Sequence, residues 1–111
     1  MLKFNFLGKV YNIKLKTDRY ANNKNLYIGM DCYEDGYWEP FGDITVNLSM
    51  RCKENCGFVD VNNLPGIDRF IKENNLGRPT GIIVPSGWVM YPEYKFNMVE
   101  IQKYCDLKYM G

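Results

Sequence analysis

The segment LKFNFLGKVYNIKLK, residues 2–16, decides the fold class because its apolar and polar side chains alternate with a period of two. Successive side chains of a strand point to opposite faces, so this alternation is typical of strands that bury one face. Gly8 and Lys9 interrupt the pattern at a position suited to a tight turn, and the alternation resumes beyond them. The segment therefore predicts an antiparallel β-hairpin.

The same pattern continues further along the chain. Asn25–Tyr33 alternates again, and Asp35-Gly36 is a dipeptide that favours a two-residue hairpin turn. Pro40 lacks an N–H group, so we expect it at a sheet edge or a bulge, after which residues 44–48 resume the pairing. A short strand is expected over residues 58–61. We expect an irregular strand at 82–84, a turn at 85–87 and a strand at 88–91.

Two helices are expected in the C-terminal half. The first covers about residues 65–75, starts at a cap formed by Asn62 or Asn63 and ends at Gly77. Its core stripe repeats at three- and four-residue spacing. The stripe consists of Leu64, Ile67, Phe70 and Ile71. A second, short helix is expected from Asn97 to about Tyr104.

These elements predict an α+β fold for residues 1–111 as a single domain. We expect an antiparallel sheet of about five strands, one main helix and a short C-terminal helix. The first residues enter the alternating pattern directly, without a charged segment followed by an apolar run. No stretch approaches the roughly 18 to 20 apolar residues that span a bilayer. We therefore expect a cytoplasmic protein that does not associate with membranes.

The composition offers little that could support catalysis. The chain has no histidine, which excludes a conventional triad, an imidazole base and histidine-bound metal. It has no Walker loop and no G-x-G-x-x-G motif. We expect no catalytic residues, no cofactor and no enzymatic activity.

The cysteines leave one chemical alternative. Cys52 and Cys56 have C-x3-C spacing, but a zinc site would need Cys32 and Cys105 to converge on them as well. We expect four reduced thiols and no bound metal. A small metal- or thiol-dependent enzyme remains the alternative.

The net charge is +1, but its distribution is uneven. Residues 1–24 hold six basic residues and one acidic residue, whereas residues 25–60 hold seven acidic and two basic ones. Opposite charges on neighbouring strands can pair across a sheet, and this is the interpretation that we favour. The alternative is a polar surface that steers a partner.

Basic and aromatic side chains are interleaved in the first hairpin, as in proteins that stack nucleic-acid bases inside a basic groove. These residues are Lys3, Phe4, Lys9, Tyr11, Lys14 and Lys16. Nucleic-acid binding through this hairpin is therefore possible. We favour protein binding, with the aromatic rings in the core and the lysines on the outer face.

A contact surface is predicted where aromatic residues follow the turn at 85–87. Trp88, Tyr91 and Tyr94 could form an apolar anchor if a bend at Pro92 brought the three rings to one side. We expect at least one of Trp88 and Tyr94 to be exposed. The acidic hairpin at residues 31–43 is the alternative interface, through Asp35 and Glu39. Neither surface indicates an oligomeric state.

A series of short motifs resembles a known family. In order they are Thr45-Val46-Asn47-Leu48, Val59-Asp60-Val61-Asn62-Asn63, Pro65-Gly66-Ile67, Pro79-Thr80-Gly81, Ser86-Gly87-Trp88 and Tyr91-Pro92-Glu93-Tyr94-Lys95-Phe96. The series, over roughly residues 26–104, is similar to small uncharacterised proteins carried by plasmids, conjugative elements and phages of Firmicutes. The basic hairpin at residues 2–16 is not part of this resemblance.

The resemblance implies a genomic setting and no catalytic residues. Small accessory proteins of mobile elements often blunt host defences such as CRISPR or restriction systems. By that analogy we expect a non-enzymatic accessory protein that binds a host or mobile-element protein. It is expected to act as an anti-CRISPR or anti-restriction inhibitor, and the alternative is a nucleic-acid-binding accessory factor.

Overall fold

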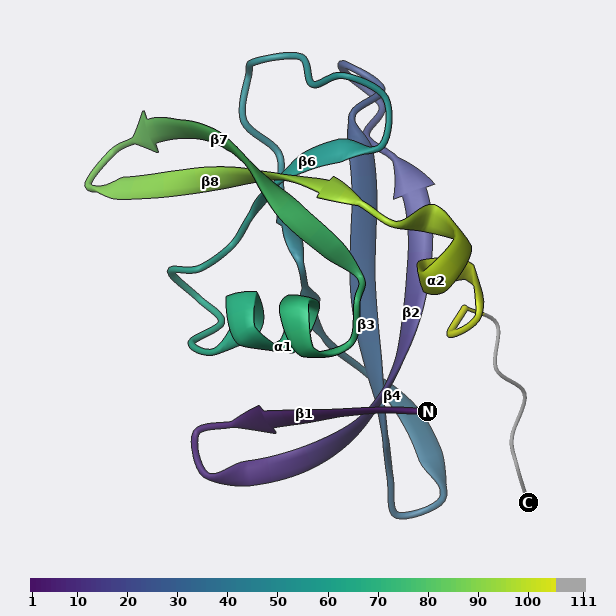
Figure 1. Cartoon of the computed structure of the whole chain (residues 1–111). Coiled ribbons are helices and arrows are strands. Elements are labelled where there is room, and N and C mark those ends of the chain that lie inside the picture. Colours follow the sequence, from purple (N-terminus) through teal and green to yellow (C-terminus); the bar gives the residue numbers. More distant parts are fainter. Residues whose placement is uncertain (106–111) are drawn as a thin grey trace.

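The computed structural model describes residues 1–105, and its first sheet is built from two consecutive hairpins (Figure 1). Four antiparallel strands lie in chain order, β1-β2-β3-β4. They are β1 (Leu2–Phe6), β2 (Lys9–Arg19), β3 (Leu26–Glu34) and β4 (Tyr37–Asp43). Both predicted hairpins are confirmed, but the first turn consists of Leu7 and Gly8 because Lys9 already pairs with Phe6. Pro40 lies on the edge strand β4, opposite a register shift between Met30 and Asp31, as expected.

A second sheet of four antiparallel strands has the order β5-β6-β8-β7. Its strands are β5 (Thr45–Val46), β6 (Cys56–Val59), β7 (Gly77–Ser86) and β8 (Val89–Phe96). Residues 1–105 thus contain eight strands in two sheets, so the expectation of one sheet with about five strands was wrong. Residues 44–48 do not resume the pairing of β4. Instead Thr45 and Val46 pair with β6, because the chain passes between the sheets at Ile44.

Both helices are shorter than expected. Helix α1 (Ile67–Glu73) begins after Gly66, which has φ 88° and replaces the predicted Asn62 or Asn63 cap. The left-handed residue after the helix is Asn75, with φ 56°, so Gly77 does not end the helix but begins β7. Asparagine tolerates this conformation because its short polar side chain can hydrogen-bond locally. Helix α2 (Met98–Gln102) begins at Asn97, whose side chain accepts a hydrogen bond from the Glu100 amide.

A single apolar cluster joins the two sheets and both helices. All four residues of the predicted helix stripe are buried, together with alternate residues of β1, β2 and β3. Helix α1 lies between the two sheets on one side of the molecule (Figure 1). Neither helix in residues 1–105 has the length and apolarity needed to cross a bilayer.

Candidate functional site

The distal part of the β7–β8 hairpin is an uncharged arm, residues 80–92, which contains no Asp, Glu, Lys or Arg. The two strands extend away from the helices and end in a free turn (Figure 1). Strand β7 is far longer than the predicted segment 82–84. Ser86 pairs with Val89, so the turn consists of Gly87 and Trp88. Gly87 has φ 61°, the left-handed value that a type II′ turn requires at its first central position.

Large apolar side chains of this arm are exposed to solvent. Trp88 at the tip is fully exposed, and 48–57% of the surface of Ile82, Ile83 and Met90 is accessible. The strand register places Ile83 with Pro92, and Pro85 with Met90, so these four side chains share one face. Scattered exposed apolar residues are common on protein surfaces, but a contiguous group without any charge makes this arm a candidate contact surface.

The three predicted aromatic anchors do not come together. Trp88 is exposed, which confirms part of the expectation, but Tyr94 is 3% exposed and belongs to the core. Tyr91 is half-buried and pairs with Val84. The predicted bend at Pro92 was wrong, because β8 continues through Pro92 and pairs it with Ile83. A continuous strand keeps Tyr94 on the opposite face from Tyr91, where its ring closes the core.

The alternative acidic surface lies on the first sheet. Asp35 is exposed in the β3–β4 turn with φ 54°, and Glu39 is exposed on β4. These two carboxylates therefore belong to a different sheet from the Trp88 arm. They could contribute to a separate surface but do not extend the arm.

The free edge of β7 has little capacity to pair with another strand. Within residues 1–105 only β8 pairs with β7, so the other edge of β7 is open there. Proline is tolerated in a strand only where its nitrogen faces away from the partner strand, so Pro79 and Pro85 direct their donor-free nitrogens to the open edge. A partner would therefore contact the side chains of the arm rather than add a strand to it.

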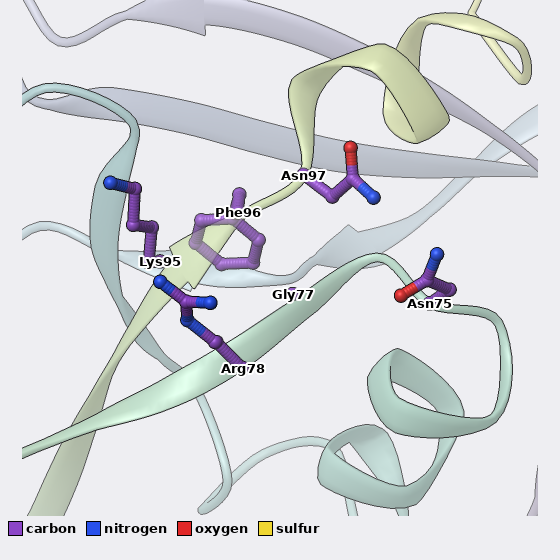
Figure 2. A pocket seen from close by; sticks show the side chains of 6 residues that line it. All are labelled: Asn75, Gly77, Arg78, Lys95, Phe96 and Asn97. Atoms are coloured by element: carbon purple, nitrogen blue, oxygen red, sulfur yellow. The ribbon is translucent and has the colours of Figure 1, made fainter.

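A pocket of about 260 Å³ lies at the base of the arm (Figure 2). It is lined by Asn75, Gly77, Arg78, Lys95, Phe96 and Asn97. Arg78 and Lys95 are paired across β7 and β8, and neither side chain makes a hydrogen bond or an ion pair within residues 1–105. Like charges in opposite positions are unfavourable. The pair is therefore suited to an anionic group and unsuited to a metal ion.

Most lysines of the first hairpin interact with acidic or aromatic side chains of the same sheet. Lys9 bonds Glu34, and Lys16 bonds Asp31 at 2.9 Å. The ammonium of Lys14 lies 4.7 Å from the centre of the Trp38 ring. The predicted pairing of opposite charges on neighbouring strands is thus present between β2 and β3. Phe4 is buried and Tyr11 is half-buried, which leaves few free rings for base stacking on this hairpin.

The cysteines form no disulfide within residues 1–105, and no three Cys, Asp or Glu side chains there are grouped as a metal site. Burial and the carboxylate of Glu93 raise the pKa of the Cys52 thiol to about 11. Burial and Glu93 also raise the pKa of Cys56, against the opposing effect of Lys95 and Lys53. Glu93 itself is buried and accepts a hydrogen bond from the Thr80 hydroxyl at 2.8 Å. These thiols are protonated at neutral pH and hence poor nucleophiles.

Sequence reasoning missed most of the arm. Ile82, Ile83 and Met90 were assigned to strands and not to a contact surface, yet they form its exposed apolar surface. One signal in the sequence could have indicated this surface. Residues 80–92 contain no charged side chain, although Arg78 precedes them and Lys95 follows them.

Comparison with known proteins gives a family but no characterised relative. Neither a curated protein nor a solved structure matches the chain. A family model described as a domain of unknown function (DUF4313) matches residues 14–110. Because this match covers most of the chain, the protein belongs to the DUF4313 family.

Proposed function

We propose that this chain is a small non-enzymatic binding protein that recognises another protein through the β7–β8 arm. The observation that carries the proposal is the uncharged arm with the fully exposed Trp88 at its tip. A tryptophan adds a large apolar contact area at low cost in side-chain entropy, and such residues dominate the binding energy of interfaces. Ile83 and Met90 would surround this anchor and exclude water.

The proposed biological role is inhibition of a host defence complex by a mobile-element accessory protein. Three of the motifs that carry the resemblance lie on the arm or at its base: Pro79-Thr80-Gly81, Ser86-Gly87-Trp88 and Tyr91–Phe96. A rigid arm that fills an apolar cleft can block a complex sterically, without chemistry. This mode of action agrees with the lack of histidine and the high thiol pKa of Cys52.

The test is direct binding of the tagged full chain to candidate defence complexes, purified from a Firmicutes host. Trp88→Ala combined with Met90→Ser should abolish binding. Tyr37→Ala should leave it unchanged, because Tyr37 is an exposed aromatic residue, at 70% exposure, in the other sheet. Thermal melts would first establish that all variants fold. Equal binding by wild type and the Trp88 and Met90 variant would show that the arm is not the interface.

A further inference from the structure

A second pocket, of about 320 Å³, lies at the end of the molecule where the β2–β3 loop meets residues 47–55. Both loops lie together beyond the ends of β2 and β3 (Figure 1). The pocket is bounded by four exposed cations, Arg19, Lys24, Arg51 and Lys53. Its only acidic side chain is Glu54. Two loops that are distant in the sequence thus build a basic pocket.

The four cationic side chains are unpaired within the described part of the chain. None of them makes a hydrogen bond or an ion pair with a residue between positions 1 and 105. This distinguishes them from Lys9 and Lys103, which are paired with Glu34 and Glu100. Grouped like charges repel one another, and the field of such a group attracts anions.

The backbone that carries these cations is held in place by buried polar contacts. The side chain of Asn25 donates to the Met50 carbonyl and accepts from the Cys52 amide, each at 2.9 Å. Asn23 donates to Asn47 at 3.0 Å in the same region. These bonds join the two loops, so the pocket is formed before any ligand arrives. Lys24 also has φ 63°, an uncommon conformation for a lysine.

We propose that this pocket binds the phosphate groups of a nucleic-acid backbone. Regularly spaced phosphates can neutralise several cations at once, and release of their counterions drives such binding. The pocket has no aromatic lining, so bases have nothing to stack on, and the recognition is of phosphate rather than sequence. Protein interfaces, by contrast, are depleted of charged residues in their core.

Further cations lie beside the strand that follows the pocket. The Lys53 carbonyl accepts a hydrogen bond from the Cys56 amide at 3.0 Å, and Cys56 is paired with Lys95 across β6 and β8. Arg78 lies opposite Lys95 on the neighbouring strand. A nucleic-acid backbone could therefore extend from the pocket along the second sheet. This site is separate from the first hairpin, where Lys9 and Lys16 are already paired.

The experiment measures fluorescence anisotropy of a short fluorescein-labelled duplex DNA of mixed sequence, titrated with the full chain over a series of sodium chloride concentrations. Arg51→Gln with Lys53→Gln should weaken binding about tenfold or more and reduce the slope of log K against log salt by about 1.8. Glu54→Gln should strengthen binding. Lys9→Gln with Lys103→Gln has the same change in net charge and should leave affinity and slope close to wild type. Trp88→Ala should do the same, which separates this site from the proposed protein interface.

The competing outcomes are distinct. Absence of DNA binding at low salt would overturn the proposal, as would equal weakening by the two double variants. Poly-glutamate that competes as well as an unlabelled duplex would identify the ligand as an acidic protein surface instead. Inorganic phosphate that competes fully at low concentration would identify a site for a free anion. A change of DNA sequence that alters affinity strongly would contradict recognition of phosphate alone.

Discussion

The ring of Phe70 on α1 lies against the ring of Phe4 on β1, with ring centroids 4.8 Å apart and an interplanar angle of 49°. Both side chains are buried, at 3% and 1% exposure. Phe4 also contacts Phe6 and Phe41, so one aromatic cluster joins the helix to the first sheet. This contact attaches α1, which leads directly into the second sheet, to the first hairpin.

Phe70→Ala should therefore destabilise the fold by about 3–5 kcal/mol, the usual cost of removing a buried phenyl ring. Urea unfolding followed by circular dichroism would measure the change in free energy of unfolding. Lys72→Ala, on the exposed face of the same helix, should change it by less than about 0.5 kcal/mol. A small effect at Phe70 would contradict the burial of its ring.

Trp88 should emit as an indole in water and be quenched readily by iodide. The sequence has one other tryptophan, Trp38, which is half-buried with its ring 5.0 Å from that of Tyr33. Trp38→Phe would leave Trp88 as the sole tryptophan, so that selective excitation of the indole reports on Trp88 alone. Blue-shifted emission protected from iodide would show that the arm is covered, by the chain itself or by a second copy. Trp88→Ala should alter the free energy of unfolding by no more than about 0.5 kcal/mol.

Gly77→Ala should be destabilising by about 1–3 kcal/mol, because a Cβ at this position would lie 2.9 Å from the Lys95 carbonyl oxygen. That oxygen belongs to the paired strand and cannot rotate away as a side chain can. Gly42→Ala is the matched control, since its Cβ would have an ordinary 3.4 Å contact with Leu64. Equal melting temperatures for the two variants would show that β7 can shift relative to β8.

The pKa of Cys52 predicts a pH dependence of stability. Its folded-state pKa is about 11, against an ordinary value of about 9, so the unfolded chain loses the thiol proton first as pH rises. The stabilising contribution is complete below pH 9 and is lost as the pH rises towards 11. Cys52→Ser should reduce the slope of stability against pH in this window. Slow alkylation of native Cys52 at neutral pH, compared with the unfolded chain, would measure the same shift.

The hairpins could be predicted from sequence because their signals are local. Alternation in residues 2–16 and the Asp35-Gly36 turn each specify contacts between neighbouring segments. The second sheet could not be predicted in the same way. Strand β5 has two residues, and β6 pairs with β8 across a long loop and a helix, so tertiary contacts decide its partner.

The candidate sites also divide into features that local sequence signals predict and features that depend on tertiary contacts. Exposure of Trp88 followed from its place beside a turn, whereas burial of Tyr94 depends on packing against residues of other elements. The basic pocket could not be predicted from the sequence for a related reason. Arg51 and Lys53 lie in a segment whose net charge is negative, and side-chain hydrogen bonds between the two loops, such as those of Asn25 and Asn23, bring them to Arg19 and Lys24.

The prolines on the open edge of β7 also bear on the behaviour of the chain at high concentration. Ile82-Ile83-Val84 combines high β-propensity with no charge, and such a segment on an open sheet edge favours pairing with another chain. Pro79 and Pro85 flank this segment and take two donors away from the edge on which another strand would have to pair. These prolines therefore oppose edge-to-edge pairing of the exposed apolar segment with a second copy of the chain.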